Sequence, residues 1–391
     1  MVETSGKMMR GFIHRERRLE PIQGPFVRPL EQRGIRLYRI DLAGQPFNLV
    51  VRHGIAESSR AWKRERHFLM KLSRPGHPGL PLILRFTCVH NQPATLEDGR
   101  SFIPLTQLVE SIPYLPGMER QMFRIPPPFV GHILVRLVDI LRYLHHRKVV
   151  SRSVHPSLLG FSQTNFRFIT LTHARNEADV DLTMVQTTDK KVAVDYDAWT
   201  PPEILSVLRG HSAFEPAWDI WSVGVLGYYL LTGKVCLDRR KPAPGITLPD
   251  YREDAIERRF DRLARMAENW GGGCRELVAF MRQSVAFNPA ERPSAEQLYW
   301  DLMNWDIRYG PRYASVELMI RRLSGAVSGP REDVLWSLML DRMNGQPPDE
   351  EIGRTGKTVL KRVSPKNSGR KSRWVFFFWR KRNGTGVSPT G

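Results

Sequence analysis

The chain has 391 residues, enough for one large domain or two to three ordinary ones, and it carries a formal net charge of +19. Its cysteines, Cys88, Cys236 and Cys274, are too scattered for a metal site or a disulfide framework, so both are excluded and buried thiols are expected. No apolar run approaches the roughly 18 to 20 residues of a membrane span, and residues 1–20 lack a signal-peptide-like apolar region, so the sequence predicts a soluble protein.

The first 112 residues predict a short arm and a small sheet. Residues 1–24 are polar and rich in arginine, and we expect a basic N-terminal arm. Residues 25–112 alternate polar and apolar positions around turns, which is typical of antiparallel strands, with one helix inserted. The predicted elements are strands within 25–55, a helix at 65–72, and strands at 80–89 and 100–108 on either side of a polar turn.

The next part of the chain predicts a helical lobe. A proline-rich linker leads into a helix predicted over 129–146, because its apolar residues recur at helical spacing. We interpret these residues as core rather than as a ligand site. They are Ile133, Leu134, Leu137, Val138, Leu141 and Leu144.

Three short motifs organise this lobe. A paired-proline run ends in Glu203, an Asp-x-Trp-Ser-x-Gly run opens an apolar helix at Asp219, and a third run contains Arg292, 89 positions after Glu203. A buried charge needs a partner, so Glu203 and Arg292 are a natural pair. This order and spacing closely resembles the C-terminal lobe of eukaryotic protein kinases. The resemblance implies that Asp219 braces the loop containing Arg152.

The resemblance also implies a two-lobed α+β fold. We expect a small antiparallel β N-lobe at 25–112 and a mainly helical C-lobe at 113–305, followed by a helical extension at 306–350 and a basic, aromatic and disordered tail at 351–391.

The nucleotide-binding positions of that family are degraded here. A glycine-rich loop should cover the phosphates, but residues 30–38 hold one glycine, and Glu31 would place a carboxylate there. The third strand ends in Arg52 instead of the phosphate-pairing lysine, and the two side chains are not interchangeable at such a site. The resemblance makes Glu65 the partner of Arg52, although Glu65 is equally well interpreted as a solvated charge. The two residues are expected to be the remnant of a nucleotide site.

The catalytic positions are replaced as well. In the family's loop motif, Ser153 stands at the base aspartate, His155 at the lysine and Leu158 at the metal-binding asparagine. The window that should hold the metal-binding aspartate contains Leu171 and Thr172. No carboxylate is available to grip Mg²⁺, which prefers oxygen anions.

Scaffold motifs are kept while the chemistry is lost, so we interpret the chain as a pseudokinase that acts as a non-catalytic scaffold or allosteric regulator. No magnesium is expected, and binding of ATP without metal stays open. The alternative is an atypical active Ser/Thr kinase with relocated metal ligands, such as Asp179 or Asp181.

Within the kinases, residues 199–203 and the proline-rich linker are similar to the rhoptry kinases of apicomplexan parasites, and the missing glycine loop resembles the branch that lacks it. That resemblance implies a secreted protein acting at a vacuolar membrane, with an active kinase or a host factor as its partner. Otherwise a cytoplasmic location is expected.

The C-terminal residues combine an amphipathic part with a basic part. Apolar residues within 316–323 and 334–343 have helical spacing and predict two helices that pack on the C-lobe. From 352 onward there are eleven Lys and Arg and no acid, and basic residues bracket the aromatic run 374–379. Segment 370–382 therefore fits an anionic membrane surface, while docking of the aromatics on the lobe is an equal alternative and a nucleic-acid partner is not expected.

Overall fold

The chain divides into two compact units, residues 1–346 and 347–391, and everything described below lies in the first unit. The predicted arm, most of the helical extension and the basic tail lie outside the described residues. The computed structural model describes residues 20–21, 31, 34–42, 45–52, 59–72, 76–81, 83–89, 92–98, 102–111, 123–152, 154–162, 165–171, 173–177, 194–195, 199–203, 215–237, 239–243, 246–249 and 251–311.

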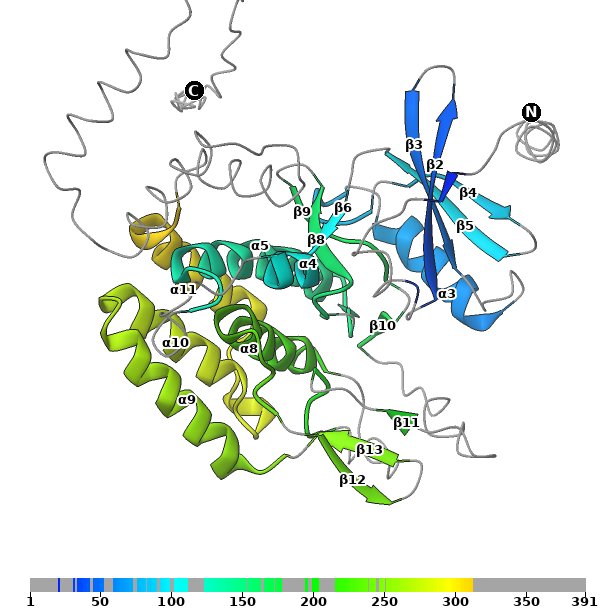
Figure 1. The fold of residues 1–391 in the computed structure, drawn as a ribbon. Coiled ribbons are helices and arrows are strands. Elements are labelled where there is room, and N and C mark those ends of the chain that lie inside the picture. Colours follow the sequence, from blue (N-terminus) through cyan, green and yellow to red (C-terminus); the bar gives the residue numbers. More distant parts are fainter. Residues whose placement is uncertain are drawn as a thin grey trace, which may run out of the picture. The chain divides into compact units, whose positions relative to one another are not determined.

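The N-terminal region is an antiparallel sheet of strand order β1-β2-β3-β5-β4 (Figure 1). β2 and β3 pair along their whole length from Ile35↔Arg52 to Leu42↔Gln45, so β3 delivers Arg52 at the end of a central strand. The strands are β1 (Glu20–Pro21), β2 (Ile35–Leu42), β3 (Gln45–Arg52), β4 (Ile83–Val89) and β5 (Gln92–Asp98).

Two strand predictions were wrong in this region. Residues 92–98 form β5 instead of a polar turn, because alternate residues such as Ala94 are buried in the sheet. The predicted strand at 100–108 is only β6 (Phe102–Pro104), followed by helix α4 (Leu105–Ser111). Pro104 has no N–H to continue the ladder, and proline is well tolerated just before a helix.

Helix α3 (Arg60–Leu72) is amphipathic, and Phe68, Leu69 and Leu72 belong to the same core cluster as the buried side chains of the helical region. Its buried positions recur at three- and four-residue intervals and include the carboxylate of Glu65 among apolar side chains. The buried residues are Trp62, Glu65, Phe68, Leu69 and Leu72.

The later part of the chain is mainly helical, which together with the N-terminal sheet confirms the predicted two-lobed α+β fold. Helix α5 (Pro127–His146) lies in the core, and all six apolar residues predicted for it are 0–1% exposed. The other helices are α8 (Ala217–Thr232), α9 (Glu253–Glu268), α10 (Gly272–Ser284), the single 3-10 turn η1 (Pro289–Glu291) and α11 (Ala295–Tyr309).

Short strands frame the junction between the two regions. β6 pairs with β8 (Leu159–Ser162), which pairs with β9 (Asn165–Phe168), and this small sheet holds the chain between Leu158 and Ile169. The remaining pairs are β7 (Val149–Val150) with β10 (Arg175–Asn176), and β13 (Ile246–Pro249) with β11 (Val194–Asp195) and β12 (Arg239–Ala243). Among the helices of the described residues, none combines the length and apolarity that crossing a bilayer requires.

Candidate functional site

The ion pair expected between Arg52 and Glu65 is present and fully buried. The guanidinium donates from Nε to Oε2 at 2.6 Å and from Nη2 to Oε1 at 2.8 Å, and both side chains are at most 1% exposed. Nη1 donates to the Val50 carbonyl and to Thr95 Oγ1, each at 3.1 Å. Four hydrogen bonds to protein therefore occupy a side chain that has five N–H donors.

A second buried pair, which was not predicted from the sequence, adjoins the first. Glu97 on β5 lies 3.5 Å from Arg167 Nη1 on β9, and Thr95 Oγ1 donates to Glu97 Oε1 at 3.1 Å. Thr95 thus joins the two pairs into one buried network of two arginines and two glutamates, which is neutral when all four are ionised. Thr95 and Glu97 are two residues apart, so in a strand their side chains lie on the same face. This spacing would have indicated the network if residues 92–98 had been predicted to be a strand.

Folding shifts the pKa values of the two glutamates of this network in opposite directions. Burial alone would raise the pKa of Glu65, but the charge and hydrogen bonds of Arg52 outweigh it and hold that pKa below its ordinary value. Burial raises the pKa of Glu97, and Arg167 at its longer distance only partly offsets the effect. Of the two glutamates, folding therefore favours the charged form of Glu65 and the neutral form of Glu97.

Glu65 also joins helix α3 to the chain that follows β9. Thr170 Oγ1 donates to Glu65 Oε1 at 2.5 Å, and the Leu171 N–H points at the same oxygen from 3.4 Å. Leu171, predicted at the position of the metal-binding aspartate, is completely buried. Thr172, the other candidate for that position, lies outside the described residues.

Leu158, predicted at the metal-binding asparagine position, is packed into an apolar cluster between the sheet and the C-lobe. It is 1% exposed, and its carbonyl accepts from the Ile169 N–H at 3.0 Å. Side chains of β2 and β3 reach the same cluster, so both regions of the chain contribute to it. The members are Ile35, Leu37, Val50, Phe102, Leu158 and Ile169.

The donor chemistry of this region does not fit a divalent metal. Leu158 and Leu171 offer hydrocarbon where the kinase motif has an amide and a carboxylate, and hard cations need oxygen ligands. Within the described residues, no three His, Cys, Asp or Glu side chains are arranged as a metal site.

His155, predicted at the lysine position, is held within its own loop. Its Nδ1 accepts from the Ser157 N–H at 3.1 Å and lies 2.7 Å from Ser157 Oγ, while its ring packs edge-on against Trp199 at 5.1 Å. These contacts hold the imidazole against its own loop and Trp199. Ser153, at the base position, lies outside the described residues.

Asp219 braces the loop that contains Arg152, as the motif implied. Its buried carboxylate accepts from the Ser151 and Arg152 N–H groups, both at 2.7 Å, and lies 2.8 Å from His145 Nε2. Arg152 has a φ of 52°, a left-handed conformation that is uncommon for a residue with a side chain. The hydrogen bonds from these two backbone N–H groups to Asp219 hold the loop in this conformation.

Glu203 and Arg292 form the bidentate pair expected from their spacing, with the Arg292 side chain buried and that of Glu203 21% exposed. Nη1 donates to Oε1 at 2.6 Å and Nη2 to Oε2 at 2.9 Å. Arg292 also donates to the carbonyls of Ala217, Ala286 and Phe287, so one guanidinium ties the start of α8 to the turn before α11.

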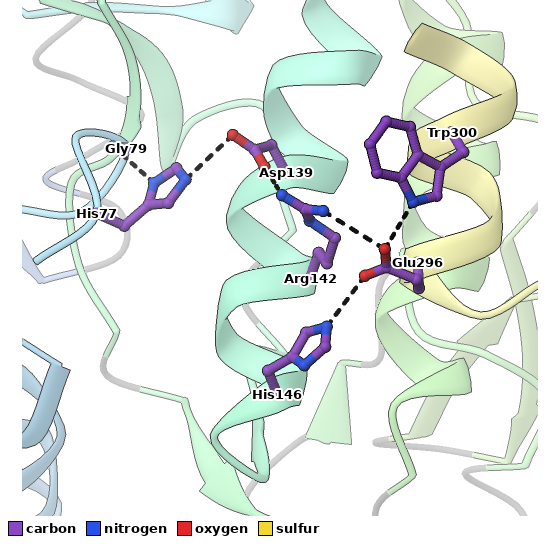
Figure 2. Close-up of polar contacts among 7 residues, drawn as sticks. All are labelled: His77, Gly79, Asp139, Arg142, His146, Glu296 and Trp300. Atoms are coloured by element: carbon purple, nitrogen blue, oxygen red, sulfur yellow. Dashed lines mark hydrogen bonds and ion pairs between the residues drawn. The ribbon is translucent and has the colours of Figure 1, made fainter. Parts of the chain in front are cut away.

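A polar cluster that the sequence analysis did not identify connects α5 to its neighbours (Figure 2). His77 Nδ1 accepts from the Gly79 N–H at 3.0 Å, which leaves Nε2 to donate to Asp139 Oδ2 at 3.2 Å. The hydrogen bond from His77 lowers the pKa of Asp139, and Arg142, 3.0 Å from the other carboxylate oxygen, adds to the effect.

The same cluster continues onto α11, and we call this part the α5–α11 clamp. Arg142 and His146 on α5 reach Glu296 at 3.5 and 3.0 Å, and the Trp300 indole N–H donates to Glu296 at 2.7 Å (Figure 2). The Arg142 guanidinium also lies 4.0 Å above the Tyr299 ring. The clamp thus links the first turns of α11, through Glu296, Tyr299 and Trp300, to α5.

Comparison with known proteins gives one family match and several partial relatives. A family model described as "Protein kinase domain" matches residues 98–301, so β2, β3 and α3 lie outside the match. A "Putative ribosomal protein S6 kinase alpha-2" of Caenorhabditis elegans is 26% identical over 167 residues, which cover 41% of this chain and 20% of that protein. "Myosin light chain kinase A" of Dictyostelium discoideum is 26% identical over 168 residues, 42% of this chain and 50% of that protein. The chain thus spans half or less of the length of these relatives.

Proposed function

Because this chain belongs to the protein kinase domain family, we propose that it is a pseudokinase, a kinase-fold protein that acts as a scaffold or allosteric regulator by contacting another protein. The proposal depends on which features of the family are retained. The pairs Glu203–Arg292 and Asp219–loop hold the C-lobe together, whereas the positions that would handle Mg²⁺ and phosphate do not fit that task.

The observation that carries the proposal is the burial of Leu158 in its apolar cluster. Phosphoryl transfer in this family depends on metal ions and positioned charges that stabilise the transferring group. A buried leucine packed against Ile35, Leu37 and Val50 offers no ligand atom and excludes water from the place where a metal ligand belongs. A water molecule therefore cannot take the place of the missing metal ligand at this position.

The state of Arg52 supports the same reading. Four of its N–H groups bond to Glu65, Val50 and Thr95, and its carboxylate partner has no exposed surface. An ion pair between the strand cation and the helix glutamate is also in place in active kinases, so the pair itself does not distinguish the two states. What supports the proposal is that Nη1 is bonded inside the sheet, to the Val50 carbonyl and to Thr95 Oγ1. In this proposal Arg52 is a structural residue that fixes α3 against the sheet.

A kinase fold without catalytic groups can still act by binding another molecule through its surface. We propose that this partner is a protein. An active kinase and, under the rhoptry resemblance, a host factor are the two kinds of partner that the sequence motifs favour. Segment 370–382 adds a proposed contact with an anionic membrane.

Phosphoryl transfer tests the proposal directly. The full chain is incubated with labelled ATP, magnesium or manganese, and a generic Ser/Thr protein substrate, beside Arg52→Ala and the exposed-helix control Arg66→Ala. We expect no transfer above the no-enzyme background in any sample. Transfer by the natural chain and by Arg66→Ala that disappears in a folded Arg52→Ala variant would show an active nucleotide site and refute the proposal.

The second candidate is an atypical active Ser/Thr kinase, and the relatives, which are named as protein kinases, favour it. It needs acids from elsewhere to replace the metal ligands, and Asp179 and Asp181 lie outside the described residues. In the same assay this candidate predicts transfer that Asp179→Asn or Asp181→Asn abolishes and Arg66→Ala does not.

A further inference from the structure

Several arginines that reach solvent in the helical region are paired with carboxylates of the same chain. Arg142 contacts Asp139 and Glu296, and α9 mixes acidic and basic residues along its length. The other pairs are Arg258 with Asp254, Arg282 with Glu257 and Asp261, and Arg308 with Glu276. These helices therefore neutralise many of their own exposed cations.

Helix α3 is different, because its exposed charges all have the same sign. Its single carboxylate, Glu65, is buried and bonded to Arg52. Lys63 and Lys71 are exposed, and no carboxylate in the described part of the chain forms an ion pair with either of them. The side of α3 that points to solvent thus carries positive charge that these parts of the molecule leave unbalanced.

We call the line of exposed residues along this side the α3 outer face. Its members recur at helical intervals, so they lie on one side of the helix. They are Lys63, His67, Met70 and Lys71. Met70 is 55% exposed, whereas Arg66 lies on the flank of this face, with its guanidinium 5.4 Å from the centre of the Phe86 ring on β4.

A third cation lies at the C-terminal end of this face. Lys71 Nζ donates to the Arg147 carbonyl at 3.4 Å, and the Tyr143 hydroxyl donates to the Leu72 carbonyl at 2.8 Å. The Arg147 guanidinium lies 3.7 Å from the centre of the Tyr143 ring, and it too forms no ion pair with a carboxylate of the described residues. Stacking orients a guanidinium while its N–H groups stay in the plane of the group, where they can reach a carboxylate.

The inner side of α3 fixes the position of this surface. Glu65 holds Arg52 and accepts a hydrogen bond from Thr170, while Phe68 and Leu72 are buried in the core. A partner that binds the α3 outer face therefore meets a helix that is already ordered, so little conformational entropy is lost on binding.

We propose that the α3 outer face and Arg147 bind an acidic segment of a protein partner. The inference rests on the proposed function, which makes the partner a protein. Carboxylates of the segment pair with Lys63, Lys71 and Arg147, and this charge complementarity gives specificity and a fast encounter. An apolar side chain of the segment packs on Met70, because a flexible thioether adapts to differently shaped neighbours.

The size and composition of this surface favour a protein over a membrane or a nucleic acid. Lys63 and Lys71 are eight residues apart, which is about 12 Å along a helix. Helices that lie in a membrane surface bury a broad apolar face, and single-stranded nucleic acid is bound through exposed aromatic rings. The α3 outer face offers one methionine and no phenylalanine, tyrosine or tryptophan.

Charge reversal in the full chain tests the proposal. The probe is a fluorescein-labelled peptide in which glutamates and aspartates flank a central leucine, and its control has glutamine and asparagine in their place. Fluorescence anisotropy compares the natural chain with Lys63→Glu/Lys71→Glu and with the charge-matched control Arg262→Glu/Arg265→Glu on α9, without nucleotide or metal. All four positions are exposed, so melting temperatures should hold. We expect the α3 variant to bind the acidic peptide on the order of tenfold more weakly and the α9 variant to stay within about twofold of the natural chain.

Equal weakening in the two variants would show a response to net charge alone, and no weakening in either would place the peptide elsewhere on the chain. Both results would overturn the proposal. It would also be overturned if the α3 variant kept the peptide but lost binding to phosphatidylserine vesicles or to single-stranded RNA, which would assign the surface to a membrane or to nucleic acid.

A photoreactive leucine at the centre of the same peptide locates the contact. Trypsin cleaves after Arg66 and Lys71, so it releases residues 67–71 as one fragment, and we expect the cross-link on this fragment at Met70. Cross-links confined to segment 370–382 would refute the contact. Neither measurement uses nucleotide, so peptide binding can fail while the absence of phosphoryl transfer stands, and it can succeed in a chain that transfers phosphate.

Discussion

The buried network around Arg52 allows a comparison of two chemically identical substitutions. Glu65→Gln and Glu97→Gln each replace a carboxylate by an amide of the same shape, and both positions are fully buried. Glu65 accepts two short bonds from Arg52 at 2.6 and 2.8 Å, whereas Glu97 lies 3.5 Å from Arg167. The structure therefore predicts different losses of stability at the two positions.

Glu65→Gln leaves a buried guanidinium without a counter-charge and opposes an amide N–H to its donors, which should cost about 3–5 kcal/mol of unfolding free energy. Glu97 already has a raised pKa, so its neutral form is partly favoured and the amide should cost only about 1 kcal/mol. Denaturant titrations of the two variants at pH 7 measure both values. An equal loss, or a larger loss for Glu97→Gln, would refute this account of the network.

Glu65 and Glu97 should also make the free energy of unfolding depend on pH, in opposite ways. The pKa of Glu65 is lowered by folding, so its stabilising contribution is present above the ordinary pKa of a glutamate and is lost as the pH falls through the lowered pKa. The stability difference between the natural chain and Glu65→Gln should therefore shrink on acidification. For Glu97, with a raised pKa, the contribution is present at low pH and is lost as the pH rises through that pKa.

Three further predictions concern other parts of the molecule. In Gly131→Ala the added methyl group would overlap the buried Trp305 ring, so unfolding free energy should fall by about 1–3 kcal/mol, and a gain would contradict the packing of α5 on α11. Arg292→Lys loses the bidentate bond to Glu203, and its melting temperature should drop by an amount equivalent to about 1.5–3 kcal/mol; an unchanged melt would contradict a structural role for the pair. Deletion of residues 370–382 removes six basic residues worth about 1 kcal/mol each at an anionic membrane, so binding to phosphatidylserine vesicles should weaken, and undiminished binding would remove this segment from the proposal.

The pairs that sequence reasoning found are those marked by motifs. Glu203 and Arg292 are 89 residues apart, but each lies within a short run whose order in the chain is informative. For Glu203 and Arg292, a buried charge required a partner and the motifs pointed to it. Arg52 and Glu65 were matched only through the resemblance to the kinase family, and a solvated Glu65 was an equal alternative until the structure showed the ion pair.

The pair of Glu97 and Arg167 could not be found in this way. It depends on the register of β5 in the sheet and on β9 lying nearby, and residues 92–98 were interpreted as a turn. Leu158 illustrates a different limit. The sequence shows that Leu158 has no atom that could bind a metal. Only the fold shows that apolar side chains from β2 and β3 share its cluster.

In the proposed pseudokinase, the apolar cluster around Leu158 supplies no ligand for the metal of a metal-bound nucleotide. A calorimetric titration of the full chain with ATP, in the presence of magnesium and again with a chelator, tests it most directly. The account predicts the same result in both titrations, either no binding or weak binding that magnesium does not strengthen. Tighter binding by tenfold or more in magnesium, about 1.4 kcal/mol, would contradict it.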